Sequence, residues 1–302
     1  MKIAIIGSGI VGSATGKYFS DVLGHQVIFN DVDINKVRTL DGEEYCATTS
    51  LEGAILGTDV AYICVPTNND TETNTKQDLQ HIIEVSKNIG KILLNNHKHY
   101  AVVVKSTVLP GTTRNVVGEL IERYSGRERG VGFYLDMEPE FLTFKNTSWT
   151  DKACMKKGPE NADRLVFGEI NSESGEVLEK VYEKVGVPKF HVSLETAEFT
   201  KYANNFLLPA RTSAWNELKL LTDELREKGI MNVDTNLVAA ILILDSRIGE
   251  YGSTHGKAWG GPCFKKDPKA FLKWAEKVRD MKMLQATVET NDEMKEKYGT
   301  RE

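Results

Sequence analysis

The chain has 302 residues, 40% of them hydrophobic and 27% charged, a composition typical of soluble globular proteins and a length that suits two domains. A net charge of −5 without any Lys/Arg block excludes a nucleic-acid-binding surface, and no apolar run approaches the ~20 residues that span a membrane. The first strand is expected to begin at Lys2, so we expect no targeting segment before it. The four cysteines have no paired spacing, so we expect them to be reduced thiols in the cytoplasm.

A glycine-rich turn between a strand and a helix opens the chain. The apolar run Lys2–Ile6 predicts a buried strand, and the glycine pattern Gly7–Gly12 follows at once. A helical pattern to about Leu23 leads into a second strand at His25–Asn30, which ends at Asp31. This order is the layout of a dinucleotide-binding βαβ unit.

The chemistry of a dinucleotide site explains each of these residues. Gly7 permits the tight turn, Gly9 lets the backbone approach a pyrophosphate, and Gly12 allows close packing of helix on strand. The helix N-terminus attracts phosphate. Asp31 is placed to bind ribose hydroxyls and would repel a 2′-phosphate, so NAD is favoured over NADP. A purely structural glycine turn is the alternative.

Two later strands end in polar residues. The runs Val60–Val65 and Ala101–Lys105 predict parallel strands, and Pro66–Thr67 and Ser106–Thr107 lie at their ends, where open α/β sheets bind ligands. The polar stretch Asn68–Asp78 predicts a flexible loop with the character of a lid.

The rest of the chain predicts a second, helical domain. Apolar segments at Val131–Tyr134 and Arg164–Phe167 extend the sheet, and the first domain is expected to end at residue 192. A long helix from Glu195 to about Lys228, kinked at Pro209, then opens a domain over residues 193–302. The fold class expected is therefore α/β: a Rossmann-like, doubly wound parallel sheet, then a long helix and a smaller α-helical dimerisation domain that closes with a helix over residues 271–297.

Three side chains in this second region have catalytic potential. Lys201 and Asn205 are four residues apart on the long helix, so both leave one face, where a lysine and an amide can stabilise a developing alkoxide. Cys263 follows two glycines and a proline and precedes two lysines and an aspartate, a setting that favours a nucleophilic thiolate. A solvated lysine and a packed, inert cysteine are the alternatives.

Taken together, these residues resemble the UDP-glucose/GDP-mannose dehydrogenase family over nearly the whole chain. The matching segments are Gly7–Gly12 with Asp31, Val65–Thr67, Lys105–Val108, Pro139–Leu142, Lys201–Asn205, Arg247–Gly249 and Gly260–Asp267. The resemblance implies oxidation of a sugar C6 alcohol to a carboxylate with two NAD, through a covalent thiohemiacetal and thioester.

The resemblance also implies a role for each site residue. Lys201 and Asn205 would hold the oxyanion, Cys263 would capture the aldehyde, and Glu140, Thr107 and Asp267 would serve thioester hydrolysis. NAD contacts are implied at Gly7, Gly9, Ile10, Val11, Gly12, Asp31, Val65, Pro66, Thr67, Ser106, Thr107 and Lys266. Substrate contacts are implied at Glu140, Phe141, Leu142, Lys201, Asn205, Arg247, Trp259, Gly260 and Cys263. Arg247 would cross to the other active site of a homodimer.

The chain departs from the family pattern in three places. Phe144 stands where the family has a second glutamate, and Lys265 stands where it has a proline. The family's C-terminal domain, which binds the nucleotide of the sugar, is expected to be absent.

The spaced histidines His97 and His99 have no carboxylate or cysteine beside them, so we expect no metal.

Two other functions remain open. A two-domain β-hydroxyacid dehydrogenase would share this plan, would perform one lysine-assisted oxidation and would need no cysteine. A non-catalytic NAD-binding remnant of the enzyme would keep the fold without turnover. UDP-glucose is the preferred substrate, but the residues do not decide which nucleotide sugar binds.

Overall fold

The computed structural model describes residues 1–96, 98–141 and 162–300. These residues form two compact units. The first unit takes in the described residues 1–68, 77–141 and 162–201, and the second takes in 69–76 and 202–300. A boundary between residues 192 and 193 stays a prediction.

An eight-stranded sheet organises the first unit, with strand order β3-β2-β1-β4-β5-β6-β7-β8. The order reverses between β1 and β4, which is the switch point where doubly wound sheets bind ligands. The strands pair in parallel except β6 and β7, which are antiparallel. The expected fold class is confirmed, with this one antiparallel pair as a departure. The strands are β1 (Lys2–Ile6), β2 (Gln26–Asn30), β3 (Cys46–Thr48), β4 (Val60–Ile63), β5 (Tyr100–Val104), β6 (Phe133–Met137), β7 (Leu165–Glu169) and β8 (Lys189–Ser193).

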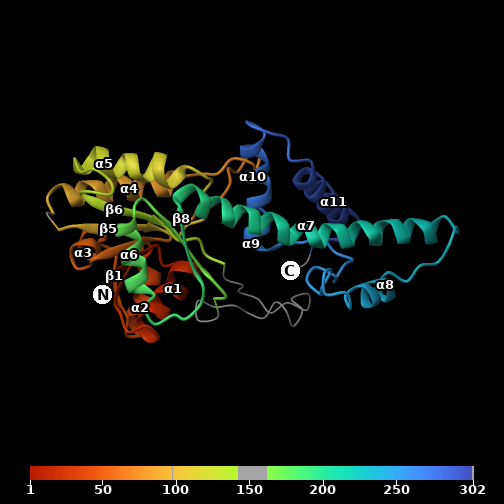
Figure 1. Cartoon of the computed structure of the whole chain (residues 1–302), viewed down its shortest axis with the longest axis horizontal. Coiled ribbons are helices and arrows are strands. Elements are labelled where there is room, and N and C mark those ends of the chain that lie inside the picture. Colours follow the sequence, from red (N-terminus) through yellow and green to blue (C-terminus); the bar gives the residue numbers. More distant parts are fainter. Residues whose placement is uncertain (97, 142–161, 301–302) are drawn as a thin grey trace. The chain divides into compact units, whose positions relative to one another are not determined.

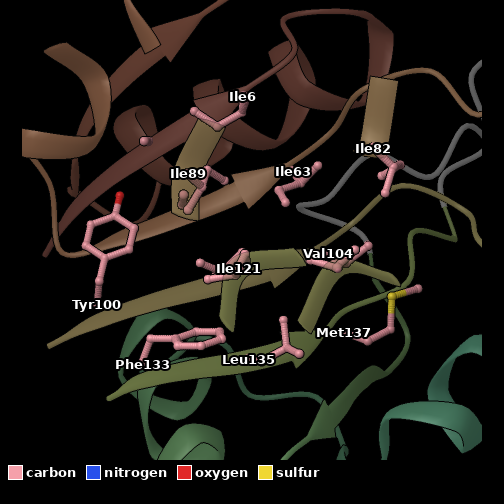
Figure 2. Close-up of a cluster of buried hydrophobic side chains, with 14 of the residues drawn as sticks. Ile6, Ile63, Ile82, Ile89, Tyr100, Val104, Ile121, Phe133, Leu135 and Met137 are labelled. Carbon is pink, nitrogen blue, oxygen red and sulfur yellow. The ribbon is translucent and has the colours of Figure 1, made fainter. Parts of the chain in front are cut away.

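Helices cover both faces of this sheet because its strands are apolar on both sides. Ile6 packs into a core with Ile89 of α4, and α4 and α5 lie along that face (Figures 1 and 2). Ile5, pointing the opposite way, packs with Phe19 of α1 and Leu178 of α6. The helical elements are α1 (Ile10–Asp21), α2 (Ile34–Gly42), α3 (Leu51–Leu56), α4 (Gln80–Leu94), the π-helix η1 (Thr113–Gly118), α5 (Glu119–Ser125) and α6 (Ser172–Val181).

The second unit is helical. Helix α7 (Leu194–Glu227) contributes its residues from 202 onward, and Pro209 lies inside it without ending it. The expected final helix over residues 271–297 is wrong: α10 (Asp267–Ala275) ends before α11 (Lys282–Tyr298) begins. The charged stretch between them has no apolar side to bury, and Val278 there is 87% exposed. The remaining helices are α8 (Thr235–Leu242) and α9 (Gly261–Phe264).

Some strand predictions also need correction. Strands β3 and β8 were not expected, because one has three residues and the other is largely exposed. The strand predicted at Val131–Tyr134 begins at Phe133, since Gly130 has a positive φ of 81° and Val131 is 69% exposed in a turn.

None of the described helices combines the length and apolar character needed to cross a bilayer. The described residues likewise contain no cluster of three or more His, Cys, Asp or Glu side chains suited to a metal ion.

Candidate active site

The glycine turn after β1 has the geometry expected of a phosphate-binding loop. Gly7 has a φ of +95°, which other residues rarely adopt, and a Cβ on Gly12 would lie 1.9 Å from the Gly7 carbonyl oxygen. A Cβ on Gly9 would meet nothing within 4 Å, so the space over this glycine is open. Gly9 is also the N-cap of α1, which has no side-chain cap, so the first N–H groups of α1 are available to a ligand.

Asp31, directly after β2, is a buried carboxylate with three donors. It accepts hydrogen bonds from the Ser8 amide at 2.8 Å, the Asp33 amide at 2.9 Å and Lys36 Nζ at 3.0 Å. Burial raises the pKa of Asp31, but the hydrogen bonds from Asp33, Lys36 and Ser8 outweigh it and lower the pKa. An ionised Asp31 suits ribose hydroxyls and repels a 2′-phosphate, so this loop fits NAD. The neighbouring Lys36 was not predicted.

The polar residues after β4 and β5, expected at these two strand ends, contact each other in the structure. Thr67 Oγ1 donates to the Thr107 carbonyl at 2.7 Å, and Ser106 Oγ donates to the Val65 carbonyl at 2.7 Å. Gln77, which was not predicted, adds a second donor to the Thr107 carbonyl at 2.7 Å. The two strand ends are therefore joined through their side chains.

Glu140 belongs to a buried charge cluster that the sequence only partly indicated. Lys105 Nζ lies 2.8 Å from Glu138 Oε1 and 3.0 Å from Glu140 Oε2, and the Tyr182 hydroxyl donates to Glu138 Oε1 at 2.6 Å. Lys105 and Glu138 are each only 3% exposed at the side chain. Burial lowers the pKa of Lys105, but Glu138 and Glu140 outweigh it and raise the pKa. Burial raises the pKa of Glu138, although Lys105 partly counters it.

Lys201 lies near this cluster through Phe141, the neighbour of Glu140. Its ammonium is 5.2 Å from the centroid of the Phe141 ring, and the guanidinium of Arg164 is 4.5 Å from the same centroid. Lys201 is only 7% exposed, which argues against a solvated lysine. Leu142 and Phe144 lie outside the described residues, as do His97 and Cys154.

In the second unit, Asn205 and Asp267 form a buried pair. Asn205 Nδ2 donates to Asp267 Oδ2 at 2.7 Å, and Lys266 Nζ lies 2.6 Å from Asp267 Oδ1. Asn205 is 3% exposed and Asp267 is 1% exposed. Cys263 is an exposed thiol on the short helix α9, four residues before Asp267.

Other expected substrate residues of the second unit have different surroundings. The Trp259 ring is buried: its Nε1 donates to Ser213 Oγ at 2.9 Å, so the indole serves packing, and Gly260 follows it as the N-cap of α9. Arg247 is 88% exposed and pairs with Asp245 at 2.6 Å. It lines a cavity of about 340 Å³ together with Trp215 and Leu218.

Some of the site residues that were not predicted could have been found from the sequence, and others could not. Lys105 is a charged residue at the end of an otherwise apolar strand, and Glu138 shares a face with Glu140 because alternate residues of an extended chain point the same way. Lys36 and Gln77 gave no signal, since a lysine and a glutamine in polar stretches are ordinary.

The sheet order, the glycine turn and the acid after β2 together define a Rossmann-type NAD-binding protein. Residues 38–186 match the NAD binding domain of the UDP-glucose/GDP-mannose dehydrogenase family, and residues 195–293 match its central domain. The chain belongs to this family, whose members are nucleotide-sugar 6-dehydrogenases, and its cofactor, as expected, is NAD.

Individual relatives agree with this membership. The chain is 31% identical to a UDP-glucose 6-dehydrogenase of Haloferax volcanii, over 97% of this chain and 70% of that protein. It is 30% identical to a GDP-mannose 6-dehydrogenase of Pseudomonas aeruginosa, over 89% of this chain and 63% of that protein. The solved structure of a UDP-glucose dehydrogenase from Pyrobaculum islandicum has a TM-score of 0.83 at 29% identity, with 98% of this chain and 68% of that one covered. The chain thus spans about two thirds of the length of these relatives.

Proposed function

We propose that the chain catalyses the NAD-dependent, four-electron oxidation of the C6 alcohol of a nucleotide sugar, UDP-glucose to UDP-glucuronate, through a covalent adduct on Cys263. The observation that carries this proposal is the buried Asn205–Asp267 hydrogen bond of 2.7 Å, four residues from the exposed Cys263 thiol. A one-step dehydrogenase has no need of an exposed cysteine four residues before such a pair. The named UDP-glucose and GDP-mannose relatives support a nucleotide-sugar substrate.

In this proposal the protein's side chains stabilise the oxyanion, transfer protons and supply the nucleophile that attacks the aldehyde carbon. Bound NAD, held by the glycine turn and Asp31, would accept a hydride in each of two oxidations. Lys201 and Asn205 donate to the C6 oxygen as its negative charge develops. The Cys263 thiolate then adds to the aldehyde carbon, and the oxygen takes a proton to give a thiohemiacetal.

The second oxidation converts the thiohemiacetal to a thioester, which water must cleave. Glu140, oriented by Lys105 at 3.0 Å, takes a proton from the attacking water, with Asp267 and Thr107 positioning that water. The C–S bond breaks and the thiolate is regenerated. The balance is one alcohol, two NAD⁺ and one water to one carboxylate, two NADH and three protons.

The stoichiometry of NADH tests this chemistry. We expect the wild type to form two NADH per UDP-glucose consumed, and to oxidise less GDP-mannose than UDP-glucose when the two compete. Cys263→Ala should lose the second oxidation. One NADH per substrate, undiminished in Cys263→Ala, would favour the β-hydroxyacid dehydrogenase alternative and sink the proposal.

We further propose that the chain works as a homodimer through the second unit. Leu237 and Ile241 share one face of α8 and are each 58% exposed, and the nearby Leu244 is 83% exposed. Leu221 of α7 is also 56% exposed. Arg247, three residues after Leu244, is the side chain we propose to reach the other subunit's substrate.

We also propose that the protein works in the cytoplasm, because the exposed thiols at Cys46 and Cys263 suit a reducing compartment.

A further inference from the structure

The polar segment Asn69–Lys76, expected to be a flexible lid, has a defined internal structure and belongs to the second unit. The Asp70 carboxylate accepts hydrogen bonds from the backbone amides of Thr73 at 2.7 Å, Lys76 at 2.7 Å and Thr75 at 3.2 Å. The backbone hydrogen bond from Thr73, followed by that from Lys76, lowers the pKa of Asp70. Asn74 adopts a positive φ of 52°, which asparagine tolerates better than most residues. The segment is therefore folded on itself.

Two asparagines of this segment bind the backbone beside Cys263. Asn69 Nδ2 donates to the Lys266 carbonyl at 2.9 Å and to the Asn74 carbonyl at 2.9 Å. Asn74 Nδ2 donates to the Lys265 carbonyl at 3.3 Å. Because Asn69 faces two carbonyls, only its nitrogen can occupy that position. Its Oδ1 is buried without a hydrogen-bond partner among the described residues, so the donors are what hold this side chain in place.

The turn that these asparagines hold carries Cys263. Helix α9 has four residues, too few to be stable by itself. The turn's own hydrogen bonds are Lys265 N to the Gly261 carbonyl at 3.3 Å and Lys266 N to the Cys263 carbonyl at 3.2 Å. Asp267, at the far side of the turn, is held by Asn205. The orientation of the cysteine thus depends on partners outside the turn, and Asn69 is the buried side chain that binds the Lys266 carbonyl.

We propose that Asn69, assisted by Asn74, is a positioning residue that fixes the Lys265–Lys266 backbone and thereby the direction of the Cys263 thiol. This inference rests on the proposed function, because it assigns Asn69 to the covalent step alone. Capture of the aldehyde needs the sulfur aligned on the carbonyl carbon, whereas the first hydride transfer does not involve the thiol. Loss of Asn69 should slow the cysteine-dependent half of the reaction and spare cofactor binding.

The test compares Asn69→Ala and Asn69→Asp with Asn68→Ala. Asn68 is the adjacent asparagine, is exposed, and has no side-chain hydrogen bond among the described contacts, so it is a matched control. We expect Asn69→Ala to lower kcat at least about tenfold, with the KM for NAD unchanged and the yield falling from two NADH per sugar toward one. Asn69→Asp should be worse, because a carboxylate faces the carbonyls that the amide bound. Asn68→Ala should behave as the wild type.

A second readout does not depend on turnover. Iodoacetamide labelling, quantified by peptide mass spectrometry, should modify Cys263 about threefold faster or more in Asn69→Ala, because a released turn presents the thiol more freely. The rate at the exposed Cys46 serves as the internal reference.

Several results would overturn the positioning role: an unchanged Cys263 labelling rate, an unchanged NADH yield, equal impairment in Asn68→Ala, or a loss that includes weaker NAD binding and a lower Tm. If the wild type forms no NADH with any sugar, the proposed function fails, and the labelling comparison alone then decides whether Asn69 positions the thiol.

Discussion

Lys105 brings a positive charge into the core of the first unit, where two carboxylates neutralise it. Its partners Glu138 and Glu140 lie 2.8 and 3.0 Å away, and Tyr182 supplies a further donor to Glu138. A buried charge left without its partner is costly, whereas a complete and hydrogen-bonded set is tolerated. Lys105 therefore matters to stability as well as to the orientation of Glu140.

Replacing Lys105 by methionine should destabilise the protein in a pH-dependent way. At pH 8 we expect a loss of about 3–5 kcal/mol, because Glu138 is left as an uncompensated buried carboxylate. Burial then holds the folded pKa of Glu138 above its unfolded value, so the folded state binds the proton more tightly and stability falls as pH rises through that range. The loss should be smaller at pH 5 than at pH 8, measured by urea unfolding.

Two further variants check this explanation. Lys105→Met combined with Glu138→Gln should recover most of the stability at pH 8. Lys228→Met, which removes an exposed pair with Glu224, should leave the free energy of unfolding nearly unchanged at either pH, because water screens this pair. A Lys105→Met loss that is the same at pH 5 and pH 8 would contradict the electrostatic account.

The residues that could be predicted from sequence are those whose role is set by their immediate neighbours. Gly7, Gly12 and Asp31 follow from one strand–turn–helix pattern, and the structure has them in that geometry. Asn69 could not be predicted in its present contact, because its partner is a backbone carbonyl 197 positions away and a carbonyl leaves no trace in a sequence. Lys105 and Glu138 are intermediate cases: their positions next to predicted strands and motifs are visible in the sequence, but their pairing is not.

At the scale of elements, strands and helices with a strong local sequence pattern were predicted, and those with a weak pattern were missed or misassigned. Strands β1 and β2 were predicted closely because buried parallel strands are continuous apolar runs. Strand β8 alternates and is mostly exposed, so its sequence carries little signal. The pattern over residues 271–297 was interpreted as one helix because charged residues between α10 and α11 are individually good helix formers.

Helix α8 offers an element-scale test of the proposed dimer. The double substitution Leu237→Lys and Ile241→Lys places two charges on its exposed apolar face, and we expect the dimer dissociation constant to rise at least about a hundredfold. Sedimentation velocity measures the change. Val131→Lys is the control, because Val131 is 69% exposed in the first unit and is not part of α8. A dimer that survives the α8 substitutions would place its interface elsewhere.

At the scale of the whole molecule, the expected site residues divide between the two units. The first holds the glycine turn, Asp31, Thr107, Glu140 and Lys201, and the second holds Asn205, Cys263 and Asp267. All the expected NAD contacts except Lys266 lie in the first unit, so cofactor binding should depend mainly on residues of that unit, whereas oxidation of a sugar should need both sets. Ligand-induced stabilisation can separate these two requirements without relying on turnover.

We expect NAD at a hundred times its dissociation constant to stabilise the wild type by about 2.7 kcal/mol, and NADP at the same concentration by much less. Asp31→Ala should narrow the difference between the two cofactors, because it removes the carboxylate that repels a 2′-phosphate. Cys263→Ala should keep the full NAD effect, since its thiol belongs to the second unit. Thermal shift with both cofactors, followed by UDP- and GDP-sugars added to the NAD complex, gives the measurement. Stabilisation by NAD without any sugar effect or NADH formation would leave a non-catalytic NAD-binding protein, whereas a further shift with UDP-glucose would show that the NAD complex binds this sugar.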